Sequence, residues 1–90
     1  MKLSVVFTKR FKKDFKRVEK LEKKLLQLKE TIISLTEGKP LNKRLLDHPL
    51  KGDYKDCREC HLAPDFLLIY KIEGETLILI RCGSHAEFFE

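Results

Sequence analysis

The chain has 90 residues, of which 42% are hydrophobic and 37% are charged, and this length provides for one small hydrophobic core. We therefore expect a single domain over residues 1–90, and no stretch approaches the roughly 20 apolar residues of a membrane span. The formal net charge of +5 favours an anionic partner such as nucleic acid, a membrane surface or an acidic protein, although an ordinary basic surface explains the charge equally well.

The first element predicted from the sequence is a strand at residues 3–7 (LSVVF), which are mostly apolar and partly β-branched. This run is shorter than the core of about 7–15 apolar residues in a signal peptide. We therefore expect a cytoplasmic protein with reduced thiols and no membrane partner.

The next region, from Lys9 to Thr36, contains neither proline nor glycine and is predicted to be helical. Thr8 is a favourable N-cap at its start, and Gly38 followed by Pro40 ends it. Its apolar residues recur at intervals of three or four: Phe11, Phe15, Val18, Leu21, Leu25, Leu28, Ile32 and Leu35. One long helix and a helical hairpin both fit this period, and we prefer two helices with a break near Leu21.

The helical region also carries the basic charge. Between Lys9 and Glu30 there are ten basic and four acidic residues, so this segment has a net charge of +6, more than the whole chain. The pattern indicates either a solvated helix surface with ion pairs between successive turns or a surface that follows the phosphates of a nucleic acid.

A polar connector over residues 41–54 leads to three predicted strands at about 54–61, 66–72 and 76–82. The turns between these strands contain Pro64 and Gly74, which favour two consecutive hairpins and hence an antiparallel sheet. The predicted order is β-α-α-β-β-β, an α+β fold in which two N-terminal helices pack on one face of the sheet. The tail after residue 82 begins with a turn and can end as a helical turn.

The chain has three cysteines, an odd number that fits no closed disulfide framework. Cys57 and Cys60 have the spacing of a zinc-binding pair. Because they lie in an expected strand, residues three apart point to opposite faces of the sheet. We therefore favour buried apolar cysteines over a structural zinc site.

Three histidines lie outside the helical region, at positions 48, 61 and 85, and each has an acidic residue nearby in the sequence. In the predicted sheet, the strand that ends at His61 and the strand that leads to His85 finish at the same edge. Glu59 shares a strand face with His61, and Arg81 precedes the turn before His85. Histidine titrates near neutral pH and is the usual general acid or base.

Imidazoles, carboxylates and a guanidinium together suit RNA cleavage without a metal ion. A base removes the 2′-OH proton, a cation stabilises the phosphorane charge and an acid protonates the leaving 5′ oxygen. Three histidines could also bind zinc, and each one alone could be an ordinary surface or capping residue. The residues by themselves thus indicate an RNA- or phosphate-binding domain and leave nuclease activity open.

Several segments of the chain resemble the YafQ-type toxins of the RelE/ParE superfamily: DHPLKG (47–52), RECHLAPDFLLIY (58–70), RCGSHAEFF (81–89) and FTKRFKKDFKRV (7–18). The resemblance implies the toxin of a type II toxin–antitoxin module, an endoribonuclease that cuts translated mRNA, generally on the ribosome, and that is neutralised by a cognate antitoxin. It implies contact with DNA only through the toxin–antitoxin complex, and no cofactor. It also implies a RelE-like fold, with two helices packed on a curved antiparallel sheet.

The resemblance further implies a role for each matching residue. The expected catalytic residues are His48, His61, Asp65 and His85. The expected substrate-binding residues are Glu59, Arg81 and Phe89, and no metal ligand is expected. In this hypothesis Asp65 or His61 is the base, and His85 is the acid. Arg81 stabilises the transition state, His48 positions the phosphate and Phe89 stacks on a base. The alternative is a non-catalytic RNA- or protein-binding module on the same fold.

Overall fold

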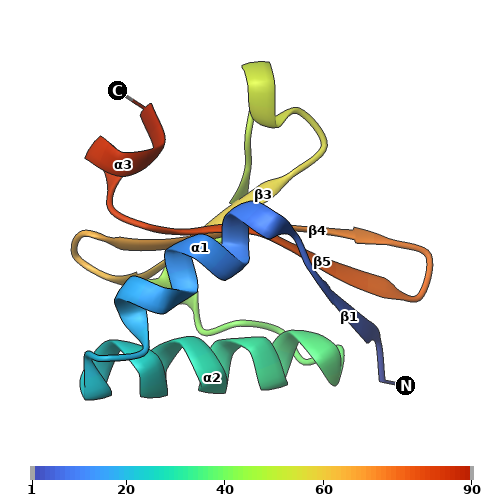
Figure 1. Ribbon diagram of the computed structural model, residues 1–90. Helices are drawn as coiled ribbons and strands as arrows, with labels where there is room; N and C mark the ends of the chain where they lie inside the picture. Colours follow the sequence, from blue (N-terminus) through green and yellow to red (C-terminus); the bar gives the residue numbers. More distant parts are fainter. Residues whose placement is uncertain (1, 90) are drawn as a thin grey trace.

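A computed structural model of the chain describes the backbone of residues 2–89 and the side chains of residues 2–88 (Figure 1). The elements follow in the order β1 (Ser4–Phe7), α1 (Lys9–Val18), α2 (Glu22–Thr36), η1 (Lys43–Leu45), β2 (His48–Pro49), η2 (Gly52–Tyr54), β3 (Arg58–Ala63), β4 (Phe66–Glu73), β5 (Thr76–Gly83) and α3 (His85–Phe89). The strands form one sheet in the order β1-β5-β4-β3-β2. None of the described helices combines the length and apolar character needed to cross a membrane.

The expected pair of N-terminal helices is confirmed, with the break next to Leu21. The N–H of Leu21 bonds to the carbonyl of Val18 at 2.9 Å, and Leu21 itself has an extended backbone that starts α2. The predicted cap is also present, since the Thr8 hydroxyl accepts the N–H of Phe11 at 3.1 Å. The same hydroxyl lies 2.9 Å from the carbonyl oxygen of Leu79, so this cap also fastens the start of α1 to β5.

The three C-terminal strands pair antiparallel, as predicted, but the complete sheet is mixed. Strand β1 runs parallel to β5, with Ser4 opposite Thr76 and Phe7 opposite Leu79. A hairpin fixes the direction of its two strands, whereas β1 reaches the sheet through two helices, which leaves its direction undetermined by the sequence pattern. The prediction of a wholly antiparallel sheet was therefore wrong at this strand.

Two local differences affect the region that leads to the histidines. Strand β3 begins at Arg58, later than predicted, because η2 and a left-handed Asp56 (φ 71°) occupy the preceding residues. The connector also contributes the two-residue strand β2, which the sequence did not predict and which pairs His48 with Glu59. The connector histidine is therefore part of the sheet.

The sheet has a hydrophobic cluster on each face. The larger cluster lies under α1 and α2, and its buried residues are Phe11, Val18, Leu28, Leu35, Cys60, Leu62, Phe66, Leu68, Tyr70, Leu77, Leu79 and Cys82. The smaller cluster contains Cys57, Leu67, Ile69 and Phe88 of α3. Figure 1 shows α2 and α3 on opposite sides of the sheet. Since Cys57 and Cys60 belong to different clusters, the prediction that they point to opposite faces is confirmed.

The buried cysteines should resist alkylation in the folded protein. All three are free and buried, and burial raises the pKa of both Cys60 and Cys82 to about 12. At pH 8 only about one such thiol in ten thousand is the reactive thiolate. We expect iodoacetamide to label Cys60 and Cys82 only after denaturation, as measured by mass spectrometry with and without urea. Rapid labelling of Cys60 without urea would contradict the packing described above.

Candidate active site

The three histidines lie side by side at one end of the sheet and form a histidine row (His48, His61 and His85). The ring centroids of His48 and His61 are 5.8 Å apart, and those of His61 and His85 are also 5.8 Å apart. The first two rings come from the paired strands β2 and β3, and the third comes from the start of α3. The prediction that His61 and His85 reach the same end of the sheet is therefore confirmed.

A buried carboxylate lies between two members of the row. Oε1 of Glu59 is 3.6 Å from Nε2 of His48 and 3.4 Å from Nε2 of His61. Two features bring these atoms together: His48 is opposite Glu59 in the sheet, and Glu59 and His61 are two residues apart on one strand face. The Glu59 side chain is only 5% exposed, and its Oε2 atom has no hydrogen-bond partner among the described residues.

The third histidine is held by a different carboxylate. Oδ1 of Asp65, in the β3–β4 turn, is 3.2 Å from both the backbone nitrogen and the ring Nδ1 of His85. A carboxylate only accepts hydrogen bonds, so Nδ1 of His85 carries a proton. Hydrogen bonds from the backbone and side chain of His85 lower the pKa of Asp65, which therefore remains an anion beside the imidazole.

The orientation of His48 is set by its neighbours in the connector. Nδ1 of His48 is 2.6 Å from the carbonyl oxygen of Leu46, and because a carbonyl cannot donate, Nδ1 carries the proton. Between these two residues, Asp47 accepts hydrogen bonds from the Tyr70 hydroxyl at 2.7 Å and from Nε of Arg58 at 3.2 Å. Asp47 thus fixes the connector to β3 and β4 at the point where it presents His48.

Arg81 lies in the same cross-strand line as Glu59, since both are paired with Ile69 of β4. Its Nε and Nη2 atoms bond to Asp14 of α1 at 3.0 and 2.9 Å, and Nη1 donates to the carbonyl of Glu87 at 3.1 Å. Hydrogen bonding to Asp14 raises the pKa of Arg81 further above its ordinary value. Arg81 is buried, so its positive charge lies beneath the surface next to α3.

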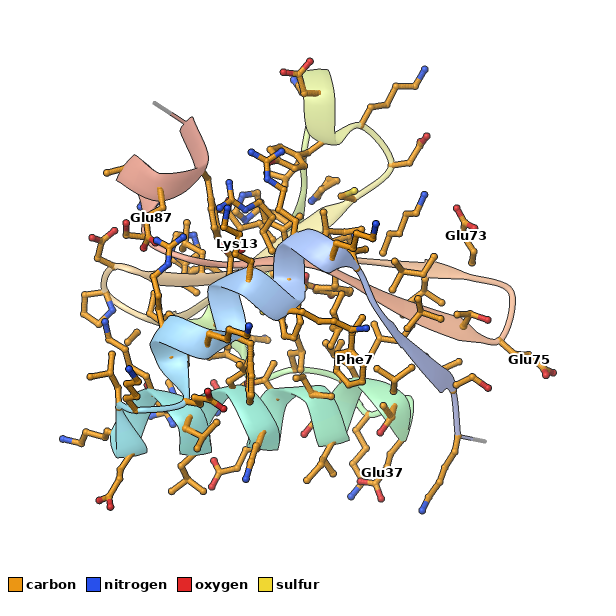
Figure 2. The ribbon with its side chains drawn as sticks, in the orientation of Figure 1. Phe7, Lys13, Glu37, Glu73, Glu75 and Glu87 are labelled. Carbon is orange, nitrogen blue, oxygen red and sulfur yellow. The ribbon has the colours of Figure 1, made fainter. Side chains whose placement is uncertain are left out.

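A groove of about 700 Å³ with a mixed polar and apolar lining lies beside His61. It lies between α2 and the connector, and its lining includes Gln27, Glu30, Arg44 and His61. On the other side of the site, Glu87 of α3 bonds to Arg17 of α1 and to the N–H of Ser84. Figure 2 shows Glu87 at the end of the molecule opposite Glu75, which lies in the β4–β5 turn.

A family model described as the bacterial toxin of the type II toxin–antitoxin system, YafQ, matches residues 3–90. The chain belongs to the YafQ toxin family. A curated relative, the mRNA interferase toxin YafQ of Escherichia coli strain K12, is 35% identical to it over 86 residues, which cover 94% of each protein.

Solved structures of YafQ-family toxins have the same fold. A chain of the Escherichia coli DinJ–YafQ toxin–antitoxin complex is 33% identical and matches with a TM-score of 0.88, covering 100% of both chains. A metal-bound toxin from Helicobacter pylori is 45% identical and matches with a TM-score of 0.87, covering 97% of this chain and 99% of that chain. The α+β fold with two helices against a sheet is therefore that of the family.

In this YafQ-family toxin, five of the seven residues expected from the sequence lie in or beside the histidine row: His48, Glu59, His61, Asp65 and His85. Arg81 lies two strands from Glu59 and is paired with Asp14, so its contact with substrate stays a prediction. Phe89 belongs to α3, but its side chain lies outside the described residues, and its stacking role also stays a prediction.

Sequence reasoning missed two residues that support this site in the YafQ-family toxin. Asp14 is buried in α1 although it is charged, and its position between Phe11 and Val18 on the apolar side of the helix was the available signal. In the sequence, Asp47 is marked only by its position next to His48. Its bond to Tyr70, 23 residues away, has no signal in the sequence.

Proposed function

We propose that this YafQ-family toxin is an mRNA interferase, an endoribonuclease that cuts mRNA by attack of a 2′-OH on the adjacent phosphorus. The observation that supports this proposal is the histidine row, with Glu59 between two of its rings and Asp65 on the third. Paired imidazoles at a rigid strand end supply both a base and an acid within reach of one phosphate.

We assign the base to His61. It is the central ring of the row, and its Nε2 lies 3.4 Å from Oε1 of Glu59. With the ring proton on Nε2 beside this carboxylate, Nδ1 has the lone pair that takes the 2′-OH proton. The carboxylate of Glu59 then stabilises the imidazolium that forms, as the aspartate does in a Ser-His-Asp triad. Asp65, the other candidate base, is engaged by the backbone and ring of His85 and is less suited to the role.

We assign the acid to His85. The carboxylate of Asp65 holds Nδ1 of the His85 ring, and the imidazolium form of this ring would give a proton to the leaving 5′ oxygen. As the new 2′ oxygen–phosphorus bond forms, the bond to the 5′ oxygen breaks. The products are a 2′,3′-cyclic phosphate and a 5′-hydroxyl end, so atoms and protons balance.

The remaining residues would bind substrate around this centre. His48, when charged, positions the phosphate next to the base, and the buried charge of Arg81 adds to the positive potential at the developing phosphorane. Phe89 stacks on a nucleobase. The groove beside His61 has the volume to accommodate a neighbouring nucleotide.

The proposed setting is the cytoplasm, where the toxin cuts mRNA on the ribosome and is held inactive by a cognate antitoxin. The E. coli relative is found in a toxin–antitoxin complex. The excess positive charge between Lys9 and Glu30 would attract ribosomal RNA or an acidic antitoxin segment. Contact with DNA would occur only through the toxin–antitoxin complex.

The experiment that tests this function is primer extension on one message in a cell-free translation reaction. We expect discrete new 5′ ends with the wild-type toxin and a loss of at least about 100-fold in their rate of appearance with His85→Ala. The matched control is Glu75→Gln, which changes a charged residue at the opposite end of the molecule (Figure 2) and should cleave like the wild type.

The same reaction also distinguishes the alternatives. If His85→Ala folds and cleaves like the wild type, His85 is not the acid, although the toxin remains a nuclease. If folded wild-type toxin produces no new ends, the mRNA interferase proposal fails and a non-catalytic binding module on this fold takes its place.

A further inference from the structure

Three potential metal-ligand atoms converge at one edge of the histidine row. Nε2 of His48, Nε2 of His61 and an oxygen of Glu59 all lie within 4.8 Å of one another. A tetrahedral ion with bonds of about 2.0–2.2 Å holds neighbouring ligand atoms roughly 3.3–3.5 Å apart. The two distances to Oε1 of Glu59, 3.6 and 3.4 Å, are already close to that value. A small rotation of the exposed His48 ring would close the remaining gap.

The tautomer of His48 is the one that a metal ligand needs. Its Nδ1–H is committed to the carbonyl of Leu46, so in the neutral ring Nε2 carries a lone pair that faces the Glu59 carboxylate. A lone pair and a carboxylate repel each other unless a cation lies between them, either a proton on the ring or a metal ion. Metal-binding histidines typically donate their second N–H to a carbonyl or carboxylate in this way.

The buried carboxylate of Glu59 supplies an independent reason for a cation. The side chain is 95% buried, and its Oε2 atom makes no hydrogen bond to any described residue. An ionised carboxylate with an unsatisfied buried oxygen is costly, and a divalent ion next to it would compensate that cost. The carboxylates of Asp65 and Glu87 are not buried in this way, because both side chains are more exposed to solvent.

We propose that His48, Glu59 and His61 bind one divalent transition-metal ion and that the bound ion inhibits the toxin. Two imidazoles and one carboxylate suit Cu²⁺ and Zn²⁺ rather than Mg²⁺ or Ca²⁺, which prefer oxygen ligands. Water would complete the coordination, because His48 is 45% exposed and the site is open to solvent.

The inhibition follows from the proton balance at His61, and this part of the inference rests on the proposed ribonuclease function. When Nε2 of neutral His61 binds an ion, Nδ1 must carry the ring proton. It then has no lone pair with which to accept the 2′-OH proton. The same ion takes the lone pair of His48 and the carboxylate that supports the base. One ion thus disables the base while His85 remains unchanged.

The binding test uses purified full-length toxin without a histidine tag, freed of metal with a chelator and titrated with ZnCl₂ in a calorimeter. Zinc is chosen because it does not oxidise the cysteines. We expect one ion per chain, with affinity at least tenfold weaker in Glu59→Gln and His48→Gln. The matched control is His85→Gln, a histidine of the same row outside the proposed ligand set, which should bind zinc like the wild type. Circular dichroism and urea unfolding confirm that each variant is folded.

Absence of stoichiometric binding to the wild type would overturn the site. An equal loss of affinity in all three folded variants would also overturn it, because it would show that zinc binds along the row without this ligand set.

The inhibition is tested separately by primer extension in the reaction described above. Zinc is added at one equivalent per toxin, and its free concentration is buffered at a level that leaves the ribosomes active. This addition should reduce the cleavage rate at least tenfold, and excess chelator should restore the rate. Cleavage unaffected under saturating zinc would overturn the inhibitory role. If zinc binds as expected but the metal-free toxin never cleaves, the metal site stands and the ribonuclease function fails, so the two failures are distinguishable.

Discussion

Replacement of Asp14 with alanine is expected to lower the free energy of unfolding by about 3–5 kcal/mol, because it leaves the buried Arg81 guanidinium without its counter-charge. Asp14 is 2% exposed and accepts hydrogen bonds from two nitrogens of Arg81 and from the backbone N–H of Cys82. The alanine variant removes all three bonds. Urea unfolding followed by circular dichroism should show a lower midpoint with an unchanged slope.

Arg17→Ala is the matched control for this prediction. Arg17 also approaches Asp14, at 3.8 Å, but its side chain is largely exposed, and such pairs contribute only about 0–1 kcal/mol. A double variant, Asp14→Ala with Arg81→Leu, should recover part of the lost stability because it removes the unpaired charge. A loss below about 1 kcal/mol in Asp14→Ala would show that Arg81 finds another partner or water, and that the fold does not depend on this ion pair.

Replacement of His61 with alanine is expected to reduce the cleavage rate by about 100- to 10,000-fold, the usual contribution of a general base. Glu59→Gln should also slow cleavage, because the amide keeps the shape of the side chain but cannot stabilise the His61 imidazolium. If Glu59 acts through His61, the double variant His61→Ala with Glu59→Gln should be no slower than His61→Ala alone. The measurement is the rate at which new 5′ ends appear, at equal concentrations of folded toxin.

Two outcomes would contradict this assignment. If the two losses multiply in the double variant, Glu59 contacts the substrate or the transition state independently of His61. If His61→Ala cleaves at the wild-type rate while His48→Ala does not, the base is the outer ring of the row. Both variants must retain the wild-type unfolding midpoint within a few tenths of a molar urea for the comparison to hold.

The local parts of the fold could be predicted from the sequence. These parts are the Thr8 cap, the break near Leu21 and the two C-terminal hairpins. Each depends on residues close together in the chain, so a local sequence pattern is enough to predict it. The direction of β1 and the existence of β2 could not be predicted. Each depends on pairing with a distant strand, and β2 has only two residues and contains a proline.

The site, like the fold, could be predicted only where its contacts follow from the local hairpins. The meeting of His61 and His85 follows from the directions of the hairpin strands, whereas His48 joins them only through β2, and its inclusion depended on the family resemblance. The partner of Arg81 is 67 residues away in the sequence, so no local pattern indicated that this guanidinium is buried against Asp14. Long-range contacts that place polar groups are set by the packed structure as a whole.

The parallel pairing of β1 with β5 determines when the toxin can fold during its own translation. Strand β1 is synthesised first but can pair only after β5, the last strand, has been made. In the folded chain Ser4 is opposite Thr76, and the Thr8 hydroxyl bonds to the carbonyl of Leu79. Strand β5 is also an inner strand of the sheet, and His85 follows it directly. Non-local pairing of this kind is completed late. A chain that ends before Thr76 should therefore show no cooperative urea transition. Such a chain should also be harmless to the cell that makes it. Toxicity then begins only when translation of the toxin is nearly finished.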